Sequence, residues 1–182
     1  MRRLLAHGHD GGVSVQRLGP ADREALKAAR LRSLLDAPRA FGSSYEREVG
    51  FPDEVWDGRL ADRVNAQFAW IGADGTALGI ATFVHDRDDR RIGYLVGMWV
   101  DPAVRGTGAA DRLIEAVADT ARRAGATVLR LHVADGNARA ERVYERHGFH
   151  RTGRSVVRSR DGVREHQMEA RLARPTSIDH TT

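Results

Sequence analysis

The sequence predicts an α/β protein of the α+β kind, with one mixed, mostly antiparallel seven-stranded sheet flanked by about four helices. Apolar runs of strand type and stretches of helical periodicity follow one another in the order β-α-α-β-β-β-α-β-α-β-β. Asp74-Gly75 and Asp161-Gly162 each separate two strand-like runs, and such dipeptides favour tight hairpins and antiparallel pairs. The stretch 95–121 instead passes from an apolar run through a basic, glycine-containing turn into an amphipathic helix.

Periodicity and chain breakers place the individual elements. Pro38 ends the first helix, Pro52 stands in the first turn of the second, and Ser43-Ser44 is a candidate cap for a short helix between them. Parallel crossovers are expected around the two later helices. The expected elements are a strand over 13–18, helices over 21–36 and 52–64, strands over 67–73, 78–85 and 92–100, a helix after the turn at 105–110, a strand starting near 128, a helix after 137, and strands over 155–159 and 163–172.

Length and composition indicate one globular domain. The chain has 182 residues, of which 41% are hydrophobic and 30% charged, and these are ordinary values for a globular protein with one core. We expect a single domain over 13–173, preceded by a flexible leader over 1–12 and followed by a polar tail over 174–182.

The charge pattern argues against a nucleic-acid partner. The formal net charge is +4, and Lys27 is the only lysine among the basic residues. The arginines are interspersed with acidic residues and form no basic stripe, so their excess is better explained by a GC-rich coding sequence than by a polyanionic partner.

The absence of cysteine excludes disulfides, a thiol nucleophile and a cysteine-based zinc site, and no metal is expected. The longest apolar run is too short to span a bilayer, and the first residues contain no apolar segment of the secretory type. We therefore expect a cytoplasmic protein with no membrane partner.

The turn at 105–110 has the features of an anion-binding site. It reads Arg-Gly-Thr-Gly-Ala-Ala, and its backbone N–H groups are expected to converge with the positive end of the following helix. Gly106 and Gly108 permit backbone angles closed to other residues, and Arg105 adds a permanent charge. The turn alone is a weak signal, because the patterns GxxxxGK[ST] and GxGxxG are both missing.

A second segment, 129–149, makes the pattern specific, because it contains an Asn before a helix that carries a Tyr and ends in Gly-Phe. Together the two segments resemble the GCN5-related N-acetyltransferase (GNAT) superfamily, over about residues 93–152. The family's acyl-CoA motif, R/Q-x-x-G-x-G/A, is filled by Arg105, Gly108 and Ala110. Its next motif is filled by Asn137, Ala140, Tyr144, Gly148 and Phe149.

The resemblance implies an acetyl-CoA-dependent N-acetyltransferase that transfers an acetyl group to a primary amine of a small molecule or peptide, by direct attack in a ternary complex. The implied cofactor is acetyl-CoA, and a backbone N–H at Trp99 or Val100 would stabilise the oxyanion. The residues implied to contact the cofactor are Met98, Trp99, Val100, Arg105, Gly106, Thr107, Gly108, Ala109, Ala110, Asn137 and Tyr144.

Two residues are candidates for proton transfer. Tyr144 matches the family's tyrosine acid, although a packed helix aromatic is the alternative. His132 occupies the position at which some members carry a Glu base, and an imidazole can accept a proton near neutral pH. A histidine that merely packs on the sheet is equally compatible with the pattern, His85 is a second candidate, and attack without a dedicated base stays open.

The acceptor is not specified by the sequence, and candidates include amino acids, polyamines, an aminoglycoside-type drug and a protein N-terminus. Phe41, Tyr45 and Glu46 lie where the family forms one wall of the acceptor site, but Phe41 is equally a core anchor. Glu46, Glu48 and Asp86 could attract a cationic amine, or else they are solvated surface charges. A homodimer is compatible with the β-rich C-terminus. A catalytically silent acyl-CoA sensor is the alternative function, and a generic phosphate-binding module would leave the second motif unexplained.

Overall fold

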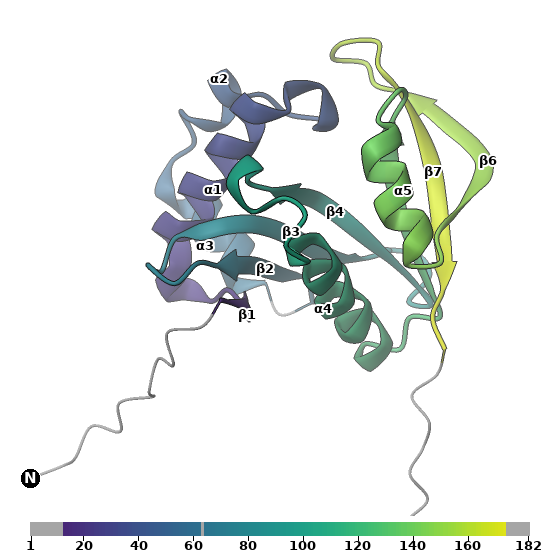
Figure 1. The fold of residues 1–182 in the computed structure, drawn as a ribbon, viewed down its shortest axis with the longest axis horizontal. Helices are drawn as coiled ribbons and strands as arrows, with labels where there is room; N and C mark the ends of the chain where they lie inside the picture. Colours follow the sequence, from purple (N-terminus) through teal and green to yellow (C-terminus); the bar gives the residue numbers. More distant parts are fainter. Residues whose placement is uncertain (1–12, 63, 174–182) are drawn as a thin grey trace, which may run out of the picture.

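The structure is a computed structural model that describes residues 13–62 and 64–173. Its strands form one seven-stranded sheet in the order β1-β2-β3-β4-β5-β7-β6 (Figure 1). The pair β4–β5 is parallel and the other five pairs are antiparallel, which confirms the predicted mixed, mostly antiparallel sheet. The strands are β1 (Ser14–Arg17), β2 (Ala66–Ile71), β3 (Ala77–His85), β4 (Ile92–Val100), β5 (Val128–Ala134), β6 (His150–Val157) and β7 (Arg164–Arg171).

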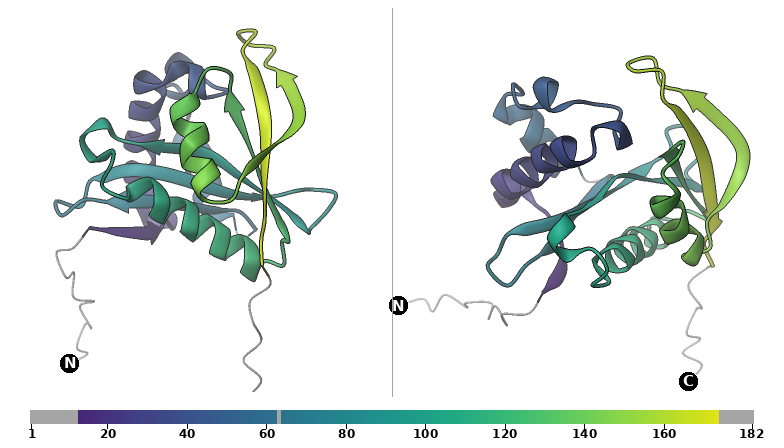
Figure 2. Two further views of the ribbon diagram at one scale, coloured as in Figure 1. Left: turned by 45° about the vertical axis from the view of Figure 1, so that its right-hand side comes forward. Right: turned by 45° about the horizontal axis from the view of Figure 1, so that its top comes forward.

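Helices cover both faces of the sheet (Figure 2). Three lie on one face and two on the other, and each group closes its own hydrophobic cluster. The first group is α1 (Arg23–Asp36), α2 (Tyr45–Glu48) and α3 (Asp53–Ala61), and the second is α4 (Ala109–Arg123) and α5 (Ala138–Arg146). Helix α2 is the short helix anticipated after Ser43-Ser44, and Ser44 caps it by accepting a hydrogen bond from the N–H of Arg47 at 3.4 Å.

Two element boundaries differ from the sequence prediction by three residues or more. Helix α3 ends at Ala61, not at 64, because the Asp62 carboxylate accepts hydrogen bonds from the N–H groups of Val64 and Asn65 and turns the chain. Strand β6 begins at His150, not at 155, and a bulge at Gly153, with φ of 81°, interrupts its alternation. The irregular stretch concealed the start of the strand.

The second crossover also differs in detail from the expectation. Helix α4 connects β4 to β5, which are parallel neighbours, as predicted. Helix α5 connects β5 to β6, but β7 lies between these two strands and is antiparallel to both. None of the described helices is long and apolar enough to cross a membrane.

Strands β4 and β5 diverge after a short region of pairing, which opens a cleft in the middle of the sheet. Their register runs only from Ile92 opposite Val128 to Tyr94 opposite Arg130. Farther along β4, Gly97 with φ of 64° and its neighbour Met98 together face one residue of β3. This bulge bends and twists β4 while β5 continues against β7, so the two strands separate.

Candidate active site

Two cavities meet in the cleft. The turn cavity, of about 570 Å³, lies beside the turn at 105–110, between the end of β4 and the face of α5. The strand cavity, of about 540 Å³, lies over β3, β4 and β5 and reaches α1 and α3. Residues that line both cavities mark their junction, and these are Ala40, Phe41, Met98, Asn137, Ala140 and Tyr144.

The turn cavity ends at the start of α4. Gly106 has φ of 84° and Gly108, the residue that caps the helix, has φ of 90°. The first helical hydrogen bond runs from the N–H of Arg112 to the carbonyl of Gly108 at 3.1 Å. The N–H groups of Ala109, Ala110 and Asp111 therefore point out of the helix end, where an anion can accept them.

The other turn residues hold this geometry. Thr107 donates its hydroxyl to the carbonyl of Val104 at 2.7 Å, and the side chain of Ala109 is buried under the helix. Arg105 donates through Nε to the carbonyl of Val100 at 2.9 Å and forms an ion pair with Asp36 at the end of α1. Arg105, Gly106, Gly108 and Ala110 line the turn cavity, whereas Thr107 and Ala109 stand behind its lining.

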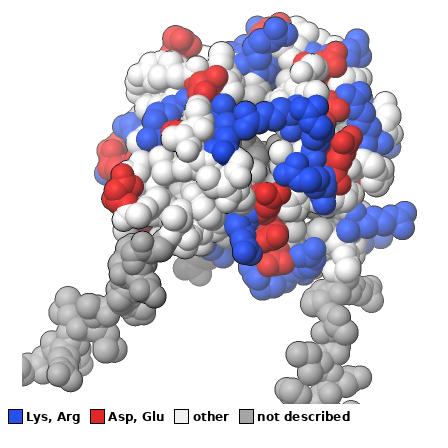
Figure 3. Space-filling model, in the orientation of Figure 1, with Lys and Arg blue, Asp and Glu red and all other residues white. Residues whose placement is uncertain are grey.

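Helix α5 brings further positive charge to the turn cavity. Arg139, Arg142 and Arg146 line it from one face of the helix, and basic side chains border the hollow seen on this side of the molecule (Figure 3). Asp111 faces them from α4, with Oδ1 2.8 Å from His147 Nε2 and 3.2 Å from the Arg146 guanidinium. The hydrogen bond with His147, and then the contact with Arg146, lower the pKa of Asp111.

The edge of β4 presents backbone groups to the cleft. Asp101 donates its N–H to the carbonyl of Leu78 on the β3 side at 2.8 Å. Because bonded and non-bonded pairs alternate in an antiparallel ladder, the N–H of Trp99 is directed to β3 and that of Val100 to the cleft. The indole of Trp99 is buried and donates to Asp36 at 2.9 Å. Met98, Trp99 and Val100 all line the turn cavity.

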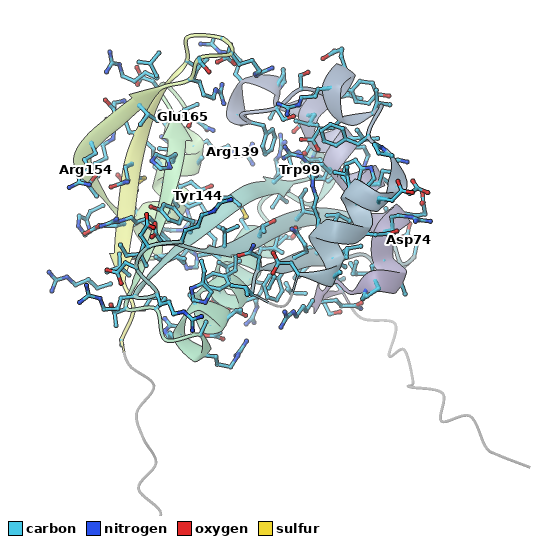
Figure 4. All side chains as sticks on the ribbon, turned by 180° about the vertical axis from the view of Figure 1, so that it is seen from behind. Asp74, Trp99, Arg139, Tyr144, Arg154 and Glu165 are labelled. Carbon is cyan, nitrogen blue, oxygen red and sulfur yellow. The ribbon has the colours of Figure 1, made fainter. Side chains whose placement is uncertain are left out.

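Tyr144 and Asn137 occupy the junction from the α5 side. Tyr144 is buried, its ring packs edge-on against Phe149 with centroids 5.9 Å apart, and burial raises its pKa to about 12. Asn137 caps α5 by accepting a hydrogen bond from the N–H of Ala140 at 3.2 Å. Figure 4 shows Trp99 on the β4 side of the space and Tyr144 on the α5 side, which places the two predicted site segments face to face.

The predicted acceptor and base residues are only partly brought together. Phe41 lies at the junction, and His132 is exposed, lines the strand cavity and has its ring nearly parallel to that of Tyr94, with centroids 6.4 Å apart. Within the part of the chain that the structure describes, Tyr45, Glu46 and His85 do not line either cavity. Tyr45 packs on the core under α1, Glu46 is exposed, and His85 packs edge-on against Phe83.

The sequence analysis did not identify three charged residues that line the strand cavity. Arg30 of α1 and Arg59 of α3 line one end, and Glu165 of β7 lines the other and pairs with Arg158 at 2.9 Å. They belong to no motif, and on the sequence they look like the polar positions of two helices and a strand. Among residues 13–62 and 64–173, no cluster of three His, Asp or Glu side chains suitable for a metal ion is found.

A cleft between diverging parallel strands, a glycine turn at the start of a helix and a buried tyrosine at the junction of two cavities are the features expected of an acyl-CoA-dependent transferase. Residues 30–149 match the Acetyltransferase (GNAT) family. The match covers more than half of the chain, so the protein belongs to this family and is an acetyl-CoA-dependent N-acetyltransferase. The comparison with curated proteins gave no match.

Solved acetyltransferase structures share the fold. An acetyltransferase of the GNAT family from Streptococcus pneumoniae has a TM-score of 0.74 at 18% identity, over 89% of this chain and 100% of that one. The structure of yncA from Salmonella typhimurium with its cofactor acetyl-CoA has a TM-score of 0.71 at 19% identity, over 93% and 99%. A spermidine N-acetyltransferase SpeG chimera from Vibrio cholerae and hSSAT has a TM-score of 0.68 at 18% identity, over 88% and 95%. At these identities the likeness establishes the fold.

Proposed function

We propose that the protein acetylates a primary amine of a small molecule or peptide, with acetyl-CoA in the turn cavity, the amine in the strand cavity, and direct attack of the amine at their junction. The observation that carries this proposal is the position of Tyr144, which lines both cavities. Ligands that occupy the two cavities together would meet beside its phenol.

The residues around the turn cavity fit the cofactor. Its pyrophosphate needs N–H donors and positive charge, which the start of α4, Arg105 and the arginines of α5 supply. Gly106 and Gly108 have no Cβ and have positive φ angles, and α4 begins after Gly108 with the N–H groups of its first residues free of helical partners. Bound acetyl-CoA would supply an acetyl group activated as a thioester.

The remaining roles fall to residues of this chain. The N–H of Val100 points into the cleft and would hydrogen-bond the thioester carbonyl oxygen as negative charge develops there. Tyr144 keeps its proton at physiological pH, since its pKa is raised to about 12, and would donate it to the departing sulfur. Asn137, at the junction, caps α5 and would keep Tyr144 in place.

His132 is our candidate for taking the proton of the attacking amine. It lies on the wall of the strand cavity and is open to solvent, which gives the proton a way out. If His132→Ala leaves the dependence of kcat/KM on pH unchanged, this role is excluded and attack without a dedicated base replaces it. We also propose that the enzyme is cytoplasmic, that it is a monomer or a homodimer, and that it has no nucleic-acid or membrane partner.

The alternative function that the sequence left open is an acyl-CoA sensor without turnover, which needs only the turn cavity. The enzyme needs the strand cavity and a proton donor at the junction, whereas the sensor needs neither. A sensor would release no CoA thiol in the presence of any amine, and its CoA affinity would be independent of acceptor amines.

Calorimetric titration of acetyl-CoA and of CoA tests the cofactor site. Binding in the micromolar range is expected, with a loss of about tenfold or more in Arg105→Glu, which reverses one charge of the turn cavity. Arg90→Glu, on the exposed turn before β4, is the matched control, and thermal unfolding checks that both variants fold. Absence of binding to the wild type would exclude the enzyme and the sensor alike.

A further inference from the structure

The end of the strand cavity that lies under α1 and α3 carries two arginines and one carboxylate. Glu48 is 2% exposed and accepts hydrogen bonds from Arg30 at 2.8 Å and from Arg59 at 3.0 Å. Burial alone would raise the pKa of Glu48, but the hydrogen bond and charge of Arg30, with Ser43 and Arg59, lower it to about 2. Glu48 is therefore ionised and engaged, which removes it as a site for a cationic amine.

Both guanidinium groups are held in place by aromatic rings. Arg30 lies 4.7 Å from the ring centroid of Phe41, a residue of the junction. Arg59 lies 4.6 Å from the ring centroid of Trp56, which is completely buried. Such stacking fixes the planar groups before any ligand binds, so little side-chain entropy would be lost on binding.

The arginines keep donors that Glu48 does not use. Arg30 contacts Glu48 through Nε and Nη2, and Arg59 contacts it through Nη1. Among the described residues, Nη1 of Arg30 and Nε and Nη2 of Arg59 make no hydrogen bond. Both side chains line the strand cavity and retain partial exposure of 14% and 31%.

The charge balance around the cavity has a definite sign. Arg30 and Arg59 oppose the single charge of Glu48, which leaves one positive charge at this end. At the other end Glu165 pairs with Arg158 at 2.9 Å, and Asp161 pairs with both Arg158 and Arg160, so the two carboxylates there are balanced by two arginines. A polyamine would meet no free carboxylate among these groups, whereas an anionic substituent would meet a preformed pair of donors.

We propose that the acceptor is an amine that also bears a carboxylate, as in an amino acid, with the carboxylate bound by Arg30 and Arg59 and the amine at the junction beside Tyr144. This inference rests on the proposed function, because it assigns the acceptor class of the same site. Arg30 and Arg59 are then specificity-determining residues, and Glu48 is the positioning residue that holds both.

Matched acceptors test the assignment on the wild-type enzyme. Thiol release is measured with amino acids, with the amines obtained from them by decarboxylation, such as phenylalanine against phenethylamine and lysine against cadaverine, and with spermidine. The best substrate is expected to be an amino acid, with a kcat/KM at least about tenfold above that of its decarboxylated partner. A preference for the decarboxylated amines or for spermidine would overturn the inference and leave the acetyltransferase proposal standing.

Substitution then locates the preference. Arg59→Gln should raise KM for the amino acid about tenfold with little change in kcat, leave the decarboxylated amine unaffected, and be partly rescued by Arg59→Lys. Arg47→Gln removes the same charge from the exposed surface of the neighbouring helix α2 and should change neither substrate. Equal effects of Arg59→Gln on both substrates would contradict carboxylate recognition.

A binding measurement covers the case in which no turnover is seen. The same acids and amines are titrated into the protein saturated with CoA. Binding of an amino acid without turnover would support the cavity assignment while removing the proposed enzymatic function. Failure of every carboxylate-bearing amine to bind would overturn the inference, whatever the behaviour of CoA.

Discussion

Oδ1 of Asp111 lies 2.8 Å from Nε2 of His147, so the first turn of α4 is joined directly to the residue that follows α5. The same carboxylate contacts Arg146 at 3.2 Å. These contacts connect the two helices that border the turn cavity and help to set its width. Asp111 also carries its negative charge where the dipole of α4 favours it.

Asp111→Asn is expected to lower the free energy of unfolding by about 0.5–1 kcal/mol at pH 7, because the partly exposed ion pair with Arg146 and a helix-dipole interaction are lost. The pKa of Asp111 is depressed in the folded protein, so its contribution is complete above the unfolded pKa near 4 and is lost as the pH falls below it. Denaturant unfolding of both proteins between pH 7 and pH 3 measures the difference. A difference that does not shrink at low pH would rule out this contact as its cause.

Glu48→Gln is expected to destabilise the protein far more, by about 3 kcal/mol or more, since the two arginines beside it would lose the carboxylate that compensates them. The depressed pKa of Glu48, about 2, means that its stabilisation is present above pH 4.5 and is lost as the pH falls toward 2. Unfolding by urea measures the effect.

Glu46→Gln is the matched control for this residue. It lies two positions earlier on the same short helix and is exposed, so its replacement should change the free energy of unfolding far less than that of Glu48. If Glu48→Gln and Glu46→Gln lowered the free energy of unfolding by similar amounts, the burial of Glu48 between two arginines would not be the cause of its effect.

Tyr144→Phe is expected to lower kcat about a hundredfold or more while leaving CoA affinity nearly unchanged, because the ring still packs on Phe149 and only the proton donor is removed. Steady-state kinetics and calorimetry on the same preparation separate the two effects. An unchanged kcat would assign Tyr144 to packing alone.

The same variant makes a prediction at alkaline pH. The pKa of Tyr144 is raised by burial from 10.0 to about 12, so its contribution to stability is present below pH 10 and is lost as the pH rises toward 12. The loss would reach about 3 kcal/mol. Tyr144→Phe should flatten this part of the pH profile, and an unaltered slope between pH 10 and 12 would contradict the assignment.

Gly108→Ala and Gly58→Ala are expected to have opposite effects. Gly108 has φ of 90°, so alanine there should cost about 1–2 kcal/mol and weaken CoA binding by shifting the N–H groups of the turn. Gly58 lies inside α3, and an added Cβ would meet no atom within 4 Å, so alanine there should add about 0.5–1 kcal/mol. Thermal unfolding of both variants measures whether each change stabilises or destabilises the protein. If both alanine variants were destabilised, the added methyl group itself, and not the positive φ at Gly108, would account for the loss.

The strands, the helices and the site segments could be read from the sequence wherever local chemistry decides them. The hairpin signals at Asp74-Gly75 and Asp161-Gly162 correctly gave antiparallel pairs, because such turns fix strand direction within a few residues. The apolar stripe of α4 and the pair Gly106 and Gly108 followed from the spacing of side chains along one helix and from the backbone freedom of glycine.

Elements with weaker local signals were placed less well. The start of β6 was missed because the bulge at Gly153 breaks its alternation, and the end of α3 was missed because the Asp62 turn is fixed by hydrogen bonds to its own neighbours. The position of β7 between β5 and β6 depends on which edges are free to pair, which no local pattern records.

The sequence by itself determined the fold class, the family motifs and some of the residues that line the turn cavity, among them Arg105, Gly106 and Gly108, because these features depend on spacing within one segment. Only the tertiary structure decided what lies in the strand cavity, where Arg30, Arg59 and Glu165 come from two helices and a strand far apart in the chain. It also decided the state of Glu48, which is a surface charge by composition and a buried anion in the fold. Burial and pairing depend on packing between segments, so the charge that an acceptor meets is a property of the folded chain.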